Sequence, residues 1–131
     1  MRHALFTSFS QDYRTPQAIY NALHAEFNFD FDPCPVYSVF DGLEAEWGQS
    51  NFVNPPYTTQ IQNAFAKKGL EEHRKGKTVV FLVPARTSTK RFHEIFLPYV
   101  SEIRFIKNRI HFENLDRAPF PSMIVIFKEK T

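Results

Sequence analysis

An Asn-Pro-Pro-Tyr tetrapeptide occupies residues 54–57, and these residue types could together hold an aromatic amine. An exocyclic amine on a purine ring is a poor nucleophile because its lone pair is delocalised into the ring. If the Asn54 side-chain oxygen and the Pro55 carbonyl each accept one N–H, that lone pair is directed outwards. Pro55 and Pro56 stiffen the loop, and the Tyr57 ring can stack on a base rotated out of a duplex. The alternative is a proline-stiffened turn without chemistry.

An amine held in this way could attack a methyl group on a sulfonium, because in-line displacement there needs no metal and no strong base. The composition agrees with chemistry of this kind. Cys34 is the one cysteine, which excludes an internal disulfide and a multi-cysteine zinc site, and the five histidines are scattered without ligand spacing. We therefore expect no structural metal.

The elements before the tetrapeptide would place it at the edge of a sheet. Thr15-Pro16 predicts an N-cap and a proline at the first position of a helix over about 16–27. The alternating residues 27–32, followed by prolines, predict a strand that ends at Asp32. Phe52-Val53 predicts a short strand that runs straight into the tetrapeptide. The motif would then lie at the carboxyl end of a strand, where open α/β sheets bind ligands.

The rest of the chain alternates between helical and strand patterns. We expect a turn at Asp41-Gly42 with a helical turn at 43–47, a helix capped by Thr58 or Thr59, a central strand over 78–83, a helix opened by Ser88 or Thr89, and strands at 103–106, 109–112 and 123–127. This order predicts an α/β sandwich with an antiparallel closing strand.

Charge is divided unevenly along the chain, although the net charge is only +2. Residues 1–73 carry four Lys/Arg against nine Asp/Glu, whereas residues 74–131 carry twelve against five. The second part is suited to a polyanion such as nucleic acid, and the first is not. The alternative is that the basic residues only solubilise one face.

Length and hydropathy set further bounds. A chain of 131 residues with 43% hydrophobic residues predicts one domain with its own core, without a fused second domain. No apolar run approaches the roughly 18 residues that a bilayer requires, and the N-terminus lacks a signal-peptide pattern. We expect a soluble protein of the cytoplasm without a membrane partner.

A series of motifs along most of the chain resembles the phage-type, Dam-like DNA N6-adenine methyltransferases. These belong to the larger group of amino-methyltransferases with an Asp/Asn-Pro-Pro-Tyr/Phe/Trp motif. The matching segments are Thr15-Pro16, Phe29 to Cys34, Gly42-Leu43 with Trp47, Phe52 to Tyr57, Leu82 to Thr87, Ile103 to Ile106 with Arg109 and Phe112, and Pro119-Phe120 with Ser122. Their order and spacing are more specific than the tetrapeptide alone.

The resemblance implies a minimal Rossmann-like methyltransferase fold with a mostly parallel sheet, S-adenosylmethionine as donor and the N6 amine of a flipped adenine in DNA as acceptor. It implies catalytic roles for Asn54, Pro55, Pro56 and Tyr57, and cofactor contacts from Thr15, Pro16, Asp32, Pro33, Cys34 and Asp41. One departure is that Asp32-Pro33-Cys34-Pro35 replaces the usual glycine-rich loop.

DNA contacts would have to come from loops of the catalytic domain or from a second subunit, because no segment is long enough to form a separate target-recognition domain. The candidates are basic residues in or beside predicted loops of the positive part: Arg86, Lys90, Lys107 and Arg109, with Arg91 and Arg117 as further options. Phe112 and Phe120 could line the pocket for the flipped base.

Two other functions remain open on the sequence alone. The same tetrapeptide serves methyltransferases that act on RNA or on an amide of a protein. A chain that has kept the fold and lost catalysis would instead be a nucleic-acid-binding protein, which the glycine-free loop favours and the intact tetrapeptide opposes.

Overall fold

A four-stranded mixed sheet forms the centre of the protein in the computed structural model, which describes residues 14–35, 41–111 and 120–128. The elements in chain order are α2 (Gln17–Phe27), β1 (Ser50–Val53), α3 (Thr59–Arg74), β2 (Thr78–Pro84), the π-helix η1 (Phe92–Phe96), α4 (Leu97–Tyr99), β3 (Glu102–Phe105) and β4 (Ser122–Phe127).

The strand order across the sheet is β1-β2-β4-β3. β1 pairs with β2 in parallel, whereas β4 is antiparallel to both β2 and β3. The antiparallel closing strand is therefore confirmed, but the expectation of a mostly parallel sheet is wrong for the described strands. The reason is that β4, the last strand, inserts between β2 and β3, which run in the same direction, and so converts their pairing into two antiparallel ones.

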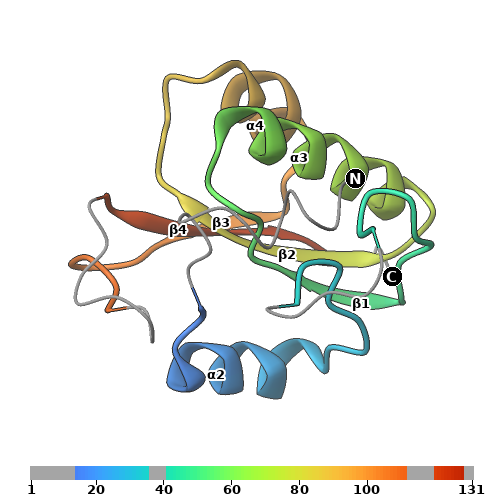
Figure 1. Cartoon of the computed structure of the whole chain (residues 1–131), viewed down its shortest axis with the longest axis horizontal. Helices are drawn as coiled ribbons and strands as arrows, with labels where there is room; N and C mark the ends of the chain where they lie inside the picture. Colours follow the sequence, from blue (N-terminus) through green and yellow to red (C-terminus); the bar gives the residue numbers. More distant parts are fainter. Residues whose placement is uncertain (1–13, 36–40, 112–119, 129–131) are drawn as a thin grey trace.

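Helices cover both faces of the sheet (Figure 1): α3 and α4 lie on one face and α2 on the other. β2 is buried along its length after Thr78, as expected for a central strand covered on both sides. Its residues alternate between the two cores: Phe81 packs in the cluster with Phe65 of α3, and Leu82 packs in the cluster with Leu23 of α2.

The predicted helix before the tetrapeptide is confirmed as α2, but its cap differs from the expectation. Pro16, not Thr15, is the N-cap, and its carbonyl accepts hydrogen bonds from the N–H groups of Ile19 and Tyr20. α2 ends at Asn28, which adopts the left-handed conformation with φ 54°. The Thr15 hydroxyl is consequently not used by the helix.

The strand expected to end at Asp32 is reduced to a single parallel bridge between Phe31 and Asn51. The Asp30 side chain competes for the ladder, since its two oxygens accept the N–H groups of Gln49 and Ser50. A side chain that satisfies backbone donors in this way replaces regular pairing. The segment still runs beside β1, and Asp32 emerges at the carboxyl end of that strand.

α3 begins and ends as its sequence predicts. Thr58 is the N-cap, with its hydroxyl accepting from the N–H of Ile61 at 3.4 Å. Gly76 follows the helix with a positive φ of 97°, which glycine adopts without steric cost. Gly69 lets the helix approach β2 closely, because a Cβ there would lie 2.4 Å from the Phe81 ring.

Two other expectations need correction. The helical turn expected at 43–47 lies earlier, because the Asp41 carbonyl accepts from the N–H groups of Glu44 and Ala45, and residues 46–48 form no helix. Residues 109–111 are not a strand, and residue 112 lies outside the described part. Thr89 does open the next helical segment, with its hydroxyl accepting from the Phe92 N–H. None of the described helices is long and apolar enough to cross a membrane.

Candidate active site

The segments that carry the candidate site residues lie together at the carboxyl ends of β1 and β2, which we call the tetrapeptide edge of the sheet. β1 and β2 are parallel, so Asn54 and the segment from Pro84 to Arg86 leave the sheet at the same edge. β4 is antiparallel, so it enters there, directly after Phe120 and Pro121. The Ala85 N–H donates to the Pro121 carbonyl at 2.9 Å, which ties these segments together.

The Asn54 side chain is held at both of its polar ends. Its amide nitrogen donates to the Thr15 hydroxyl at 2.9 Å, and its oxygen accepts from the Tyr57 hydroxyl at 2.9 Å. Both hydrogen bonds are partly buried. The tetrapeptide is thus linked to the start of α2, 39 residues earlier in the chain.

The two prolines of the tetrapeptide are buried, and their carbonyls are held by a residue that the sequence did not reveal. The Gln62 side-chain amide donates to the carbonyls of Pro55 and Pro56, at 3.2 Å each. Gln62 lies on α3 and is only 3% exposed. A carbonyl oxygen can accept two hydrogen bonds, so the Pro55 oxygen keeps acceptor capacity for a second donor. A polar amide among the buried positions of α3 was the available signal.

Aromatic rings and a cation stand beside the tetrapeptide. The Tyr57 ring meets the Phe120 ring edge-on, with centroids 5.1 Å apart. The Arg86 guanidinium lies over the Phe120 ring, 5.7 Å from its centroid. Phe120 is buried, so this group is an apolar wall with a positive charge on its outer side. Phe112, the other expected wall residue, lies outside the described residues.

The loop from Asp32 to Cys34, which holds three residues assigned to the cofactor, meets the turn at Asp41 through Pro33. The Asp32 carboxylate accepts from the Cys34 N–H at 2.8 Å, which closes a tight loop through Pro33. Gly42 packs directly on that loop, since a Cβ at Gly42 would lie 2.1 Å from the Pro33 carbonyl oxygen. The Asp41 side chain accepts from the Leu43 N–H at 2.9 Å. Only a glycine therefore fits at position 42, because any side chain would collide with the Asp32 loop. This glycine lies in the turn at Asp41 and not in the Asp32 loop itself.

Asp32 is largely buried without a compensating cation among the described residues. Burial raises the pKa of its carboxyl to about 6, against the lowering effect of the Cys34 N–H. Burial and the nearby Asp32 charge together raise the pKa of the Tyr20 hydroxyl on α2. A buried carboxylate with spare acceptor capacity fits an ammonium group or a pair of ribose hydroxyls.

The four basic residues assigned to DNA are all exposed. Arg86 and Lys90 lie in the segment after β2, and Lys107 and Arg109 lie in the segment after β3, which runs in the same direction. Within the described ranges none of the four forms an ion pair, so each charge is available to a phosphate. All four residues therefore follow β2 or β3, the strands whose carboxyl ends lie at the tetrapeptide edge.

Arg91 differs from the other basic residues because it is buried, with 6% of its surface exposed. Its guanidinium donates to the Asn63 side chain on α3 at 3.0 Å. Burial, with a smaller effect from Arg86, lowers the pKa of Arg91. Its main contact is therefore with α3, although it was a further option for DNA. Arg117 lies outside the described residues.

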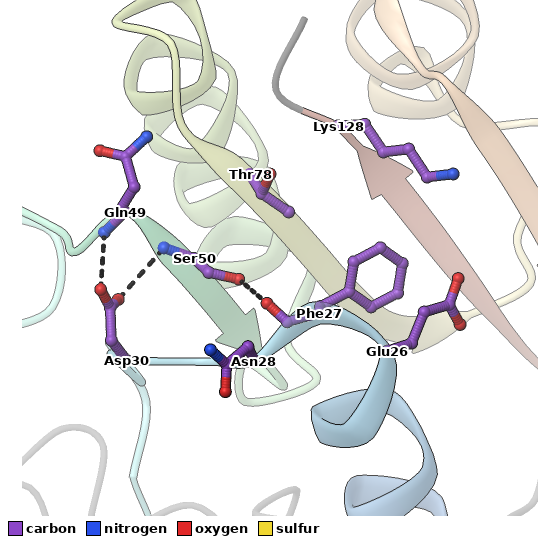
Figure 2. A pocket seen from close by; sticks show the side chains of 8 residues that line it. All are labelled: Glu26, Phe27, Asn28, Asp30, Gln49, Ser50, Thr78 and Lys128. Atoms are coloured by element: carbon purple, nitrogen blue, oxygen red, sulfur yellow. Dashed lines mark hydrogen bonds between the residues drawn. The ribbon is translucent and has the colours of Figure 1, made fainter. Parts of the chain in front are cut away.

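A cavity of about 510 Å³ opens at the opposite edge of the sheet (Figure 2). Ser50 and Thr78, the first residues of β1 and β2, line it together with Asp30. In Figure 2 the Asp30 carboxylate points at the backbone of Gln49 and Ser50, so it supports the loop. None of the residues assigned to catalysis, cofactor or DNA lines this cavity.

Comparison of the sequence with known proteins identifies the family of the chain. A search of curated proteins gave no match. The family model described as DNA N-6-adenine-methyltransferase (Dam) matches residues 5–131, which is nearly the whole chain and confirms the resemblance carried by the motifs. The protein that forms this site therefore belongs to the DNA N-6-adenine-methyltransferase (Dam) family.

Proposed function

We propose that the protein transfers a methyl group from S-adenosylmethionine to the N6 amine of an adenine that has been rotated out of duplex DNA. The observation that carries the proposal is the Asn54 amide, held at the carboxyl end of β1 beside the Tyr57 and Phe120 rings. Membership of the family supports adenine in DNA as the acceptor.

In this proposal Asn54 and Pro55 hold the reacting amine. The Asn54 oxygen accepts one N–H and the Pro55 carbonyl accepts the other, which leaves the nitrogen lone pair directed at the methyl group. Gln62 and the rigid Pro55-Pro56 backbone keep these two acceptors at a fixed separation. Tyr57 stacks on the base, and Phe120 supports the Tyr57 ring from its edge.

The cofactor residues are those around Asp32. When bound, S-adenosylmethionine supplies an electrophilic methyl group on a positively charged sulfur. The buried Asp32 carboxylate binds its ammonium or ribose hydroxyls, and Pro33, Cys34 and Asp41 line the same pocket. Thr15 and Pro16 lie near its methionine end. The tight hydrogen-bonded loop at Asp32 replaces the glycine-rich loop that most methyltransferases place there.

We further propose a minimal Rossmann-like methyltransferase fold in one domain over residues 1–131. The parallel pair β1-β2, the antiparallel strand β4 and helices on both faces are compatible with that fold. In this proposal DNA contacts come from loops at the tetrapeptide edge, through Arg86, Lys90, Lys107 and Arg109.

The test is transfer of labelled methyl from S-adenosylmethionine to unmethylated duplex DNA, followed by nucleoside mass spectrometry. We expect N6-methyladenosine with the wild type and none with Asn54→Ala. Calorimetry should show that this variant still binds the cofactor. Asn21→Ala is the matched control, because Asn21 is exposed on α2 and bonded only to Gln17 among the described residues.

The other outcomes would each replace the proposal with one of the alternatives. Cofactor binding without transfer to any DNA would indicate an acceptor in RNA or in a protein amide. A protein that binds DNA and no cofactor would be a nucleic-acid-binding protein that has lost catalysis.

A further inference from the structure

We propose that Thr15 is a positioning residue that fixes the orientation of the Asn54 amide, so that its oxygen and not its NH₂ group faces the substrate amine. This inference rests on the proposed function of Asn54. It assigns the Thr15 hydroxyl to the reaction through Asn54, which is a different task from contact with the cofactor.

An asparagine amide has two orientations that differ by half a turn about its terminal torsion, and that torsion has two broad minima. In one orientation Oδ1 accepts an N–H of the adenine amine. In the other, two N–H donors face each other, and neither the amide nor the amine is satisfied. Burial makes an unsatisfied donor costly. A site that relies on Asn54 therefore needs a device that selects the first orientation.

Thr15 and Tyr57 together provide that selection. Asn54 Nδ2 donates to the Thr15 hydroxyl and Asn54 Oδ1 accepts from the Tyr57 hydroxyl, each at 2.9 Å. A phenol is a better donor and a poorer acceptor than an aliphatic alcohol, because its oxygen lone pair is delocalised into the ring. The amide oxygen therefore prefers the Tyr57 side, where the base stacks, and the amide nitrogen prefers the Thr15 side.

The position of Thr15 is itself fixed by the backbone around it. Thr15 precedes Pro16, which restricts Thr15 to extended conformations. Pro16 is the N-cap of α2 with φ −58°, and its carbonyl accepts from the first turn of the helix. The Thr15 hydroxyl has no capping task in α2, so its contact with Asn54 can be removed without loss of a helix cap.

The first test compares Thr15→Val with Thr15→Ser in the methyl-transfer assay. Valine keeps the shape and removes the hydroxyl, so we expect kcat to fall by roughly 10- to 100-fold, as is typical when a reacting group is misplaced. The Kd of S-adenosylmethionine and the KM for DNA should change by less than about 3-fold, since uniform binding is not what is lost. Thr15→Ser should restore most of kcat.

The second test uses Asn54→Asp, because a carboxylate has two equivalent oxygens and needs no orientation. In this background we expect Thr15→Val to lower kcat by less than about 3-fold, so the two substitutions should be strongly coupled. The motif of the larger amino-methyltransferase group that the sequence resembles has either Asp or Asn at this position. If Asn54→Asp has too little activity to measure, the side-chain NH₂ resonances of Asn54 provide a readout without catalysis: Thr15→Val should shift them and speed their exchange with solvent.

Three results would overturn the inference. One is an unchanged kcat in Thr15→Val, and another is an equal loss from Thr15→Val in the wild-type and Asn54→Asp backgrounds. The third is a loss that lies in cofactor affinity alone, which would make Thr15 a cofactor contact. Absence of methyl transfer by the wild type would instead contradict the proposed function, while the NMR comparison would still decide whether Thr15 orients the amide.

Discussion

Single buried polar groups determine the shape of the tetrapeptide loop. Proline offers no N–H, so the loop cannot hold itself together through its own backbone donors at Pro55 and Pro56. Gln62 supplies the missing donors from α3 and binds both carbonyls. The acceptor geometry of the site therefore depends on a residue that does not contact the substrate in our proposal.

We expect Gln62→Leu to lower kcat by about 10-fold and to reduce the free energy of unfolding by about 1–2 kcal/mol. Leucine has similar volume, but it leaves two buried carbonyls without their donor. Methyl-transfer kinetics and urea denaturation would measure the two effects. Gln60→Leu is the control, because Gln60 is exposed on the same helix. A Gln62→Leu enzyme with wild-type kcat would show that the loop does not need this support.

Asp32 should make cofactor binding depend on pH. Its folded pKa is about 6, so protonation below that value removes the charge that binds an ammonium group. Calorimetry should show a Kd that rises by about 10-fold for each unit of pH below 6, and weak but flat binding for Asp32→Asn. Glu94→Gln, a change at an exposed carboxylate, should retain the wild-type profile. A wild-type affinity that is flat from about pH 5 to pH 7 would contradict the role of Asp32.

The raised pKa of Asp32 also affects the free energy of unfolding when no cofactor is bound. The folded pKa of Asp32 lies above its ordinary value of 3.8, so ionised Asp32 destabilises the folded state. That cost is absent below about pH 4 and complete above about pH 6, where it amounts to about 1–3 kcal/mol. Asp32→Asn should therefore be more stable than the wild type at neutral pH and similar to it in acid.

Sequence reasoning found the tetrapeptide and the carboxylate at Asp32, because their residue types have a direct chemical meaning. It did not find the role of Gln62 or the contact between Thr15 and Asn54. Both depend on side chains that meet across distant segments, and threonine before a proline at a helix start is just as well explained by capping. The local sequence cannot tell whether the Thr15 hydroxyl caps the helix or binds a distant side chain.

At the level of elements, a buried ion network fastens the segment around Trp47 to α3. Glu72 is fully buried on α3 and binds Lys77, Lys75 and Lys68. Lys77 also donates to the Trp47 carbonyl at 2.7 Å, and the Trp47 indole donates to the Gly42 carbonyl at 2.7 Å. The turn that packs on the Asp32 loop is thus supported from α3.

Glu72→Gln should reduce the free energy of unfolding by about 3 kcal/mol, because it removes the buried carboxylate that three lysines share and leaves buried Lys77 paired only with the exposed Glu46. Burial alone would raise the Glu72 pKa, but hydrogen bonds from Lys77, Lys75 and Lys68 lower it to about 2. The wild type should therefore lose this stabilisation as pH falls from about 4.5 to 2, and the variant should not. Denaturation at several pH values would measure both.

Glu71→Gln is the matched control, since Glu71 precedes Glu72 on α3 and is exposed. It should change stability by less than about 0.5 kcal/mol. Equal effects of the two substitutions would mean that the network contributes no more than a surface charge does.

Helices and strands with strong local signals were predictable: Thr58 as a cap, Gly76 as a terminator, and the apolar run that became β2. The segment before Asp32 was not predictable. The alternation of Phe29 and Phe31 predicts a strand, but the Asp30 side chain accepts the β1 N–H groups that a regular strand pairing would use. The place of the closing strand within the sheet also could not be predicted, although its antiparallel direction was. Apolar residues at 123–127 identify a buried strand but do not state between which neighbours it inserts.

At the scale of the whole molecule, positive charge and the tetrapeptide share one edge of the sheet. Arg86, Lys90, Lys107 and Arg109 follow β2 and β3, and both strands end at that edge. These four cations therefore follow strands that end together, whereas Lys75 and Lys77 precede β2 and bind Glu72. A duplex that presents a base to Tyr57 would lie against these cations.

DNA affinity should fall steeply with salt, because each phosphate contact releases counterions. Arg86→Ala should weaken binding to all sequences alike and reduce the slope of log K against log salt by about 1. Arg74→Ala is the control, since Arg74 is exposed at the end of α3 and lies over the Tyr99 ring. Fluorescence anisotropy at several salt concentrations would measure the slopes. A flat salt dependence would exclude this edge as the DNA-binding surface.

The insertion of β4 between β2 and β3 has a consequence for how the chain folds during synthesis. β2 and β3 leave the ribosome before β4, yet they have no pairing with each other and meet only through it. The sheet cannot close until the strand from Ser122 to Phe127 has emerged, so its long-range pairings form late. The proposed base-binding site also needs Phe120, which directly precedes this strand and contacts Tyr57. A chain without this segment would therefore have neither a closed sheet nor a complete site, and it would expose the apolar edge of the central strand β2.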